Sequence, residues 1–177
     1  GNSYGSQFGK SVSTAGDVNG DGYSDVIIGA PYYTNDQSSE GKTIVYHGSA
    51  SGLSLTTNWS AEGNQSNSHF GGSVSSAGDV NGDGYTDVIV GAENYSNGQS
   101  SEGKAFVYHG TSSGLSLTSN WSGENDQISA HFGYSVSTAG DVNGDGYSDV
   151  IIGAPDFENG QTDEGAAFVY QGSASGL

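Results

Sequence analysis

A nine-residue segment occurs three times in this chain, and a constant interval separates the copies. The segment reads DVNGDGYSD at 17–25 and 141–149, and DVNGDGYTD at 79–87. Both intervals are 62 residues (79 − 17 and 141 − 79), so no residue is inserted or lost between copies. A fixed period of this kind indicates a repeat architecture, in which similar units share one continuous core. We therefore expect three units, at 1–62, 63–124 and 125–177.

Each unit contains four short segments whose pattern favours β-strands. In the first unit, segments 8–13 and 53–59 alternate loosely between apolar and polar residues, and segment 42–48 contains the run Thr-Ile-Val-Tyr. Segment 25–30 is a continuous apolar run, which is typical of a strand buried on both faces. No segment has a helical period. Four antiparallel strands per unit, with recurring glycine and aromatic motifs, predict an all-β fold built from four-stranded β-propeller blades.

The charge balance excludes several classes of partner. The net charge is −17, from 20 acidic residues against three lysines, and arginine is absent. Binding to a phosphate backbone requires basic side chains that displace counterions, so we expect neither nucleic acid nor an anionic membrane surface as a partner. No apolar run approaches the roughly 20 residues that a membrane-spanning helix requires, so we expect no membrane insertion. Cysteine is absent, which excludes a disulfide framework.

Nine aspartates lie in the three repeated segments, and their spacing predicts calcium sites. Ca²⁺ takes six to eight oxygen ligands, and a short loop supplies them when alternate residues point inward around a sharp glycine turn. Positions 1, 3, 5 and 9 of each segment offer side-chain oxygens, and position 7 offers its main-chain carbonyl. The candidate ligands are Asp17, Asn19, Asp21, Tyr23 and Asp25; Asp79, Asn81, Asp83, Tyr85 and Asp87; and Asp141, Asn143, Asp145, Tyr147 and Asp149.

We expect one structural Ca²⁺ per unit, three per chain. The alternative is that the segments are solvated Asx turns without an ion. Three carboxylates within nine residues would repel one another without a cation, and three intact copies argue against chance. An EF-hand would place a Glu at position 12, but apolar strand residues occupy positions 10 to 12 here.

Further motifs flank each Asp-rich segment at fixed positions. A Phe-Gly pair precedes it and a Gly-Ala pair follows it, at 8–9 and 29–30, 70–71 and 91–92, and 132–133 and 153–154. Proline follows the Gly-Ala pair at Pro31 and Pro155, whereas Glu93 stands there in the second unit. This order resembles the FG-GAP repeat of integrin α-subunit propellers and their bacterial relatives. The resemblance implies a calcium clip between two strands, an extracellular or cell-surface location, and adhesion or ligand recognition without catalysis.

The variable loops indicate where a ligand would bind. In a four-stranded antiparallel blade, loops 31–41 and 63–69 lie at the end opposite the calcium segments, and the units differ there. Loops on a rigid scaffold often carry binding, so we expect a protein or glycan ligand on this face. A carbohydrate-binding lectin-like propeller, an enzyme accessory domain, and a fragment without a ligand remain alternatives.

Histidine and tryptophan give weaker signals. His47 and His109 share one repeat position and His69 and His131 share another, but Gln171 and Gln7 replace them in the remaining copies. We therefore expect the histidines to be surface or strand residues and not ligands. Trp59 and Trp121 occupy matching positions, where we expect them to pack against neighbouring side chains.

Three blades are too few for a closed ring, because propellers typically have four to eight. The third unit stops at Leu177, so the counterpart of 54–59 is missing. We expect a homo-oligomer, with a head-to-tail dimer that closes a six-bladed ring as the favoured form. The alternative is a piece of a longer propeller, either excised from a natural protein or engineered.

Overall fold

The computed structural model describes residues 4–177, which form eleven β-strands. No helix in this part of the chain is long and apolar enough to cross a membrane. The strands are β1 (Ser11–Gly16), β2 (Asp25–Ala30), β3 (Lys42–Tyr46), β4 (Trp59–Glu62), β5 (Ser73–Gly78), β6 (Asp87–Ala92), β7 (Lys104–Tyr108), β8 (Trp121–Gly123), β9 (Ser135–Gly140), β10 (Asp149–Ala154) and β11 (Ala166–Tyr170).

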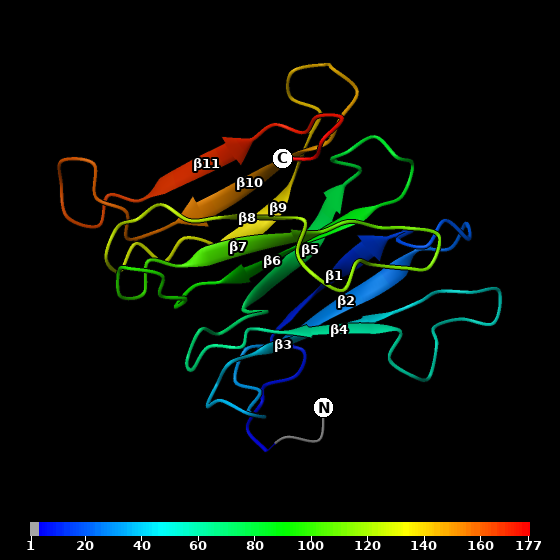
Figure 1. Ribbon diagram of the computed structural model, residues 1–177, viewed down its shortest axis with the longest axis horizontal. Helices are drawn as coiled ribbons and strands as arrows, with labels where there is room; N and C mark the ends of the chain where they lie inside the picture. The colour runs from blue at the N-terminus through cyan, green and yellow to red at the C-terminus, as the bar shows by residue number, and fades with distance from the viewer. Residues whose placement is uncertain (1–3) are drawn as a thin grey trace.

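The strands form three antiparallel sheets that follow one another along the chain. Blade 1 has the order β1-β2-β3-β4, blade 2 has the order β5-β6-β7-β8, and blade 3 contains β9, β10 and β11. Figure 1 shows the three sheets side by side in chain order, from blue through green to red. The prediction of an all-β fold made of propeller blades is confirmed.

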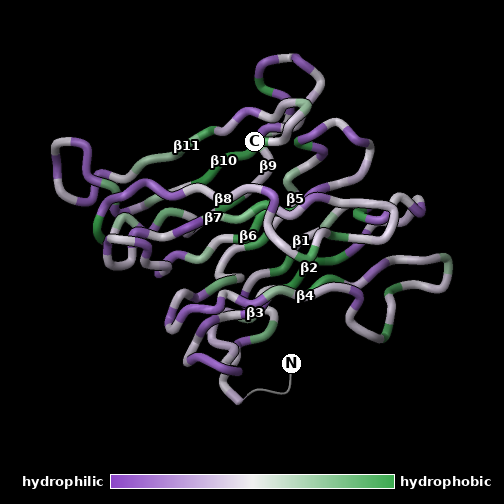
Figure 2. Tube along the Cα trace, in the orientation of Figure 1, coloured by the Kyte–Doolittle hydropathy of each residue, from purple (hydrophilic) through white to green (hydrophobic). Residues whose placement is uncertain are grey.

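The first strand of each blade lies against the first strand of the next. Strand β5 contacts both β1 and β9, as expected for the innermost strands around a propeller axis. One apolar core fills the space between blades 1 and 2, where Ile27 and Val45 meet Phe70 and Val88. A second core fills the space between blades 2 and 3. Figure 2 shows this distribution, with hydrophobic residues along the strands and hydrophilic residues in the loops.

Three of the four strand segments expected in the first unit have different bounds in the structure. The segment predicted at 53–59 is a loop until Trp59, where β4 begins and pairs with β3 in the register Lys42↔Glu62. The strand predicted at 8–13 begins at Ser11, because residues 8–10 form a turn in which the Lys10 amide donates to the Gln7 carbonyl at 2.9 Å. The strand expected at 42–48 ends two residues earlier, at Tyr46.

The glycine of each Gly-Ala pair has a packing role between blades. A Cβ atom on Gly29 would lie 2.0 Å from the carbonyl oxygen of Gly71, and one on Gly91 would lie 2.0 Å from that of Gly133. No side chain fits at such distances, so the Phe-Gly turn of one blade docks directly on the backbone of the blade before it.

Candidate metal sites and ligand face

Each repeated segment folds into a compact turn, and we call the three turns loop 1 (17–25), loop 2 (79–87) and loop 3 (141–149). In loop 1 the Asp17 carboxylate accepts backbone N–H bonds from Gly20 at 2.7 Å, Gly22 at 2.8 Å and Asp21 at 3.1 Å. The Asp21 side chain accepts from the Tyr23 amide at 3.0 Å. The same bonds recur in loops 2 and 3. The loop residues therefore fix their own backbone as Asx-type turns.

The last aspartate of each loop is buried and joins two connections of its blade. The Asp25 carboxylate accepts from the Val18 amide at 2.9 Å and from the Gly48 amide at 2.8 Å. Asp87 and Asp149 make the corresponding bonds. The pKa of Asp87 is raised to about 7, chiefly by burial. The two backbone hydrogen bonds lower this pKa, and the nearby Asp83 and Asp79 carboxylates raise it.

The pKa of Asp141 in the exposed loop 3 is lowered, chiefly by the hydrogen bond from the Gly146 amide. A carboxylate that accepts several N–H bonds is stabilised in its charged form. The first aspartate of this loop is therefore an anion that a cation would meet without displacing a proton.

The donor set of the loops suits a hard cation. All five candidate ligands of each loop lie in one turn and offer only oxygen atoms, which Ca²⁺ prefers. Among residues 4–177, every ion pair joins groups outside the loops, so the loop carboxylates have no cationic partner. No group of three or more acidic or histidine side chains converges as a ready metal cage in that range. An ion would therefore draw together oxygens that now accept backbone N–H bonds.

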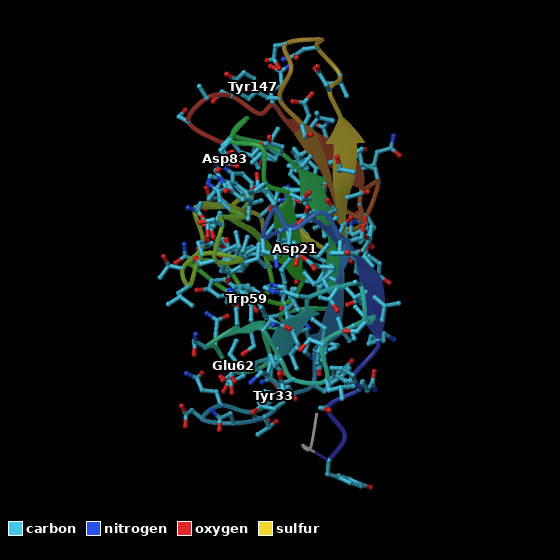
Figure 3. All side chains as sticks on the ribbon, turned by 90° about the vertical axis from the view of Figure 1, so that its right-hand side faces the viewer. Asp21, Tyr33, Trp59, Glu62, Asp83 and Tyr147 are labelled. Carbon is cyan, nitrogen blue, oxygen red and sulfur yellow. The ribbon has the colours of Figure 1, made fainter. Side chains whose placement is uncertain are left out.

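Loops 1 and 2 are also held by the next blade, a feature that the sequence reasoning missed. The Thr86 hydroxyl accepts from the Asp17 amide, and the Ser148 hydroxyl accepts from the Asp79 amide, both at 3.2 Å. The Tyr85 ring lies over Gly20, where a Cβ atom would be 2.6 Å from it. The only sequence signal was a hydroxyl residue at position 8 of every copy. Figure 3 labels Asp21, Asp83 and Tyr147, one from each loop, along the length of the molecule.

His47 and His109 stand beside the loops, as neighbours that the sequence did not predict. The Nδ1 atom of His47 lies 3.2 Å from the Asn19 amide nitrogen, and that of His109 lies 3.2 Å from the Asn81 amide nitrogen. Burial lowers the pKa of His109, although Asp83 and Asp79 act in the opposite direction. A neutral imidazole accepts from the asparagine N–H₂ and so orients the amide, whose Oδ1 atom accepts from the amide of Asp21 in loop 1 and of Asp83 in loop 2.

The two tryptophans pack between strands and blades. The Trp59 ring meets the Tyr108 ring edge to face at 4.9 Å, and its indole N–H donates to the Ser116 carbonyl at 2.9 Å. The Trp121 ring meets the Tyr170 ring at 4.9 Å. The expectation that both tryptophans serve packing is confirmed.

The connections at the opposite end of the blades form one ordered surface. The Asn67 amide donates to the Ser38 carbonyl at 2.7 Å, so the blade 1–2 connection lies along the 31–41 loop. The Gln65 side chain then exchanges two bonds, of 2.8 Å and 2.7 Å, with the backbone of Ser96 in blade 2. His69 belongs to this surface. Its Nδ1 atom lies 3.3 Å from the Glu93 carboxylate, and its ring centroid lies 4.6 Å from that of Tyr32. Neighbouring variable loops are therefore fixed relative to one another.

All three blades contribute to a small pocket on this ligand face. The pocket encloses about 210 Å³ and is lined by Lys10, Pro31, Tyr32, Gly72, Glu93 and Tyr134. It combines one cation, one carboxylate and two tyrosine rings. Such a mixture suits a ligand that carries both charged and apolar groups.

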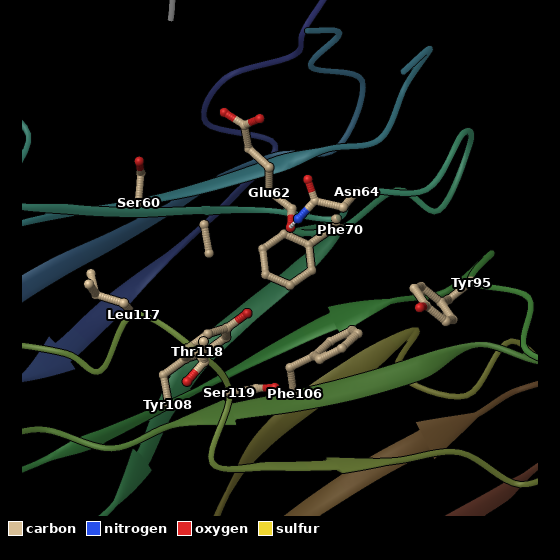
Figure 4. Close-up of a pocket in the computed structure, with 12 residues that line it drawn as sticks. Ser60, Glu62, Asn64, Phe70, Tyr95, Phe106, Tyr108, Leu117, Thr118 and Ser119 are labelled. Atoms are coloured by element: carbon tan, nitrogen blue, oxygen red, sulfur yellow. Dashed lines mark hydrogen bonds between the residues drawn. The ribbon is translucent and has the colours of Figure 1, made fainter. Parts of the chain in front are cut away.

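A larger pocket lies between the outer edges of blades 1 and 2. It encloses about 560 Å³, and Figure 4 shows Asn64 and Phe70 on one wall and Phe106 and Tyr108 on the other. Tyr95 adds a further ring, and Ser119 and the Asn64 amide are polar groups of the lining. Aromatic rings beside amide and hydroxyl groups form a second candidate binding site.

Comparison with known proteins places this architecture in a family. The FG-GAP repeat family matches the chain three times, at residues 8–46, 70–108 and 132–170. Integrin alpha-PS2 of Drosophila melanogaster is 33% identical over 167 residues, which cover 87% of this chain and 12% of the integrin. Integrin alpha-3 of Cricetulus griseus is 33% identical over 159 residues, which cover 87% of this chain and 15% of the integrin.

A nematode relative agrees with these two. Integrin alpha pat-2 of Caenorhabditis briggsae is 36% identical over 155 residues, which cover 78% of this chain and 12% of the integrin. The chain thus spans between 12% and 15% of the length of these three relatives. Since the matches begin at the Phe-Gly pairs and include all three Asp loops, the chain belongs to the FG-GAP repeat family, as an integrin-like module.

Proposed function

We propose that this chain is a calcium-stabilised recognition module without catalytic activity. The observation that carries the proposal is the set of three loops that share one hydrogen-bond pattern and offer only oxygen ligands without a cationic partner. In each loop, the carboxylates at positions 1, 5 and 9, the asparagine at position 3 and the main-chain carbonyl at position 7 would hold one Ca²⁺. The ion would neutralise the loop and fix the turn between the first two strands of its blade.

The recognition surface is the ligand face at the other end of the blades. Its connections are cross-linked by hydrogen bonds, and its central pocket draws Lys10, Glu93 and Tyr134 from three different blades. The relatives are integrins, which supports adhesion to an extracellular or cell-surface protein as the role. Calcium at one end would then stiffen a scaffold that binds at the other.

Calcium binding is tested by isothermal titration of metal-free protein. Three ions should bind per chain, and Asp83→Asn, which weakens loop 2, should remove one of them. Asp36→Asn is the matched control, because Asp36 is an exposed carboxylate outside the loops. Binding of no ion, or an equal loss in both variants, would contradict the metal sites.

The recognition role is tested by attachment of cultured cells to a surface coated with the protein. Replacing Lys10 and Tyr134 by alanine should abolish attachment, whereas Leu55→Ala, at the calcium end of blade 1, should not change it. Attachment that persists in the double variant would exclude the central pocket as the binding site.

Carbohydrate binding is the second candidate function, and the 560 Å³ pocket with its aromatic wall supports it. Sugars stack on such rings and form hydrogen bonds with groups such as Asn64 and Ser119, which also line this pocket. A glycan array should then show binding that Tyr108→Ala removes. An array without any signal would leave protein recognition as the sole proposal.

A further inference from the structure

The two interfaces within the chain are copies of each other. Four contacts of blade 1 with blade 2 recur between blades 2 and 3 with every residue number raised by 62. The first set is Gly29 with Gly71, Asp17 with Thr86, Gly20 with Tyr85, and Val18 with Thr111. The second set is Gly91 with Gly133, Asp79 with Ser148, Gly82 with Tyr147, and Val80 with Ser173.

Each end blade has one face that lacks such a neighbour. On blade 1 this face carries Phe8, Val12 and Leu53, and on blade 3 it carries Val142, Ile151 and Val169. Val12 is 64% exposed, whereas its counterparts Val74 and Val136 are 7% and 8% exposed. Val142 is 57% exposed, whereas Val18 and Val80 are fully buried. The apolar residues on both end faces are therefore exposed, although their counterparts in the internal interfaces are buried.

The free face of blade 1 also has an open socket. A hollow of about 200 Å³ is lined by Tyr23, Ser24, Gly48, Ser49, Gly52 and Leu53. In blade 2 the corresponding Gly110 has the Val18 carbonyl only 2.9 Å from the position of a Cβ atom, so loop 1 fills that socket. In blade 3, Gly172 receives the Val80 carbonyl of loop 2 in the same way. The socket of blade 1 has the shape to receive a third such loop.

Loop 3 is the loop without a socket. Asp141 and Asn143 are exposed, whereas Asp17 and Asn19 in loop 1 are half-buried. Nothing lies within 4 Å of a Cβ atom on Gly144, where Tyr85 and Tyr147 cover the corresponding glycines. Loop 3 therefore has its own internal hydrogen bonds but lacks the contacts that the next blade gives to loops 1 and 2.

We propose that two copies of this chain associate head to tail, so that blade 1 of each copy covers blade 3 of the other and completes its loop 3. Continuing the offset of 62 residues pairs Gly153 with Gly9 of the second copy and Asp141 with its Ser24. Gly144 then meets Tyr23, and the Val142 carbonyl accepts from the Ser49 amide. Every residue type that the internal interfaces use is present at these positions.

A second copy fits because the chain carries both halves of the interface. Two chains of three blades give six blades, which lies within the four to eight of known propellers. Such a contact joins two different surfaces, and a ring closes when the rotation per blade allows it. The bound ions would reduce the repulsion between two chains that each carry a net charge of −17.

Native mass spectrometry in calcium-containing buffer, together with sedimentation, tests the association. The chain should be a dimer, and Val12→Glu and Val142→Glu should each give folded monomers, because both side chains are exposed in one chain. Leu55→Glu is the matched control and should remain dimeric, because Leu55 and its counterpart Leu117 are both exposed. Gly153→Ala should also give a monomer, since the added Cβ occupies the position of the Gly9 carbonyl.

Mixing the two glutamate variants distinguishes the head-to-tail arrangement from a symmetric one. Each variant retains the face that the other has lost, so the mixture should form heterodimers through one intact contact. A wild-type chain that stays monomeric at about 100 µM would overturn the proposal. A dimer that tolerates either glutamate, or an assembly larger than two chains, would overturn it as well.

The part that concerns loop 3 rests on the proposed calcium binding, and ion counts test it separately. The dimer should hold six ions, and the Val12→Glu monomer should lose affinity at one of its three sites. A dimer without ions would contradict the metal sites but not the association. Equal affinity at all sites of the monomer would overturn the completion of loop 3.

Discussion

Loops 2 and 3 differ by one residue in sequence and share the same internal hydrogen bonds, yet they lie in different surroundings. Loop 2 is covered by Tyr147 and Ser148 of blade 3, whereas loop 3 faces solvent. The difference shows that two layers of structure support each loop. The first layer is the set of hydrogen bonds within the blade, which the nine residues of the loop form by themselves. The second layer comes from the next blade and depends on having a neighbour.

The hydrogen bonds within the blade should stabilise loops 2 and 3 equally. Removing them should give the largest loss of unfolding free energy among the variants compared. Asp87→Ala and Asp149→Ala each remove a buried carboxylate that accepts two backbone N–H bonds. The unpaired amides and the cavity should each reduce the free energy of unfolding, by about 4 kcal/mol together. Urea unfolding in chelator measures this without the ion. A much smaller loss for Asp149→Ala would show that the first layer also needs the neighbouring blade.

Alanine substitution of the glycine that contacts the next blade should destabilise blade 2 but not blade 3. Gly91→Ala places a Cβ against the Gly133 carbonyl and should cost about 3 kcal/mol of unfolding free energy, because backbone must move. Gly153→Ala meets only the Ser135 hydroxyl, a side chain that can rotate away. Its stability should be unchanged when unfolding is measured on monomeric samples. Equal losses in the two variants would contradict direct docking of the Phe-Gly turn.

The smallest expected effect concerns the tryptophans at the outer edge. Trp59→Phe removes the indole bond to Ser116 of blade 2 and should cost about 1 kcal/mol. Trp121→Phe should cost less, because the Trp121 indole donates no hydrogen bond within residues 4–177 and its ring packs on Tyr170. Thermal unfolding of the two variants, side by side, compares them. A larger loss for Trp121→Phe would mean that packing on Tyr170 outweighs the hydrogen bond.

The repeat period and the apolar runs were sufficient to predict the blades. Segment 87–92, the counterpart of 25–30, became the fully buried strand β6, because blades 1 and 3 cover both faces of its apolar run. Strand β2 has one neighbouring blade, and two of its six residues are only half-buried. The alternation of Leu53 and Leu55 was misleading. Ser54 and Asn58 instead bond to nearby backbone, with the Ser54 hydroxyl donating to the Thr56 carbonyl at 2.7 Å and Asn58 accepting from the His47 amide at 2.9 Å. Local side-chain bonds of this kind compete with strand pairing.

The five candidate ligands of each loop lie in one turn but do not converge as a metal cage within residues 4–177, so their role as ligands stays a prediction, and the supports of the loops were not foreseeable. Thr86 lies 69 residues from Asp17 in sequence, and only the stacking of blades makes them neighbours. The same holds for the Tyr85 ring over Gly20. The sequence pattern predicts the contacts within one repeat. The contacts between repeats depend on how the blades stack in three dimensions, which the pattern does not give.

The central claim is that calcium holds the loops, and thermal unfolding in calcium against chelator tests it most directly. Binding at 100 times the dissociation constant would add about 2.7 kcal/mol per site. The melting temperature should therefore rise substantially in calcium, and the triple variant Asp21→Asn, Asp83→Asn, Asp145→Asn should lose most of that rise. Identical melting curves for the wild-type chain in calcium and in chelator would contradict the account.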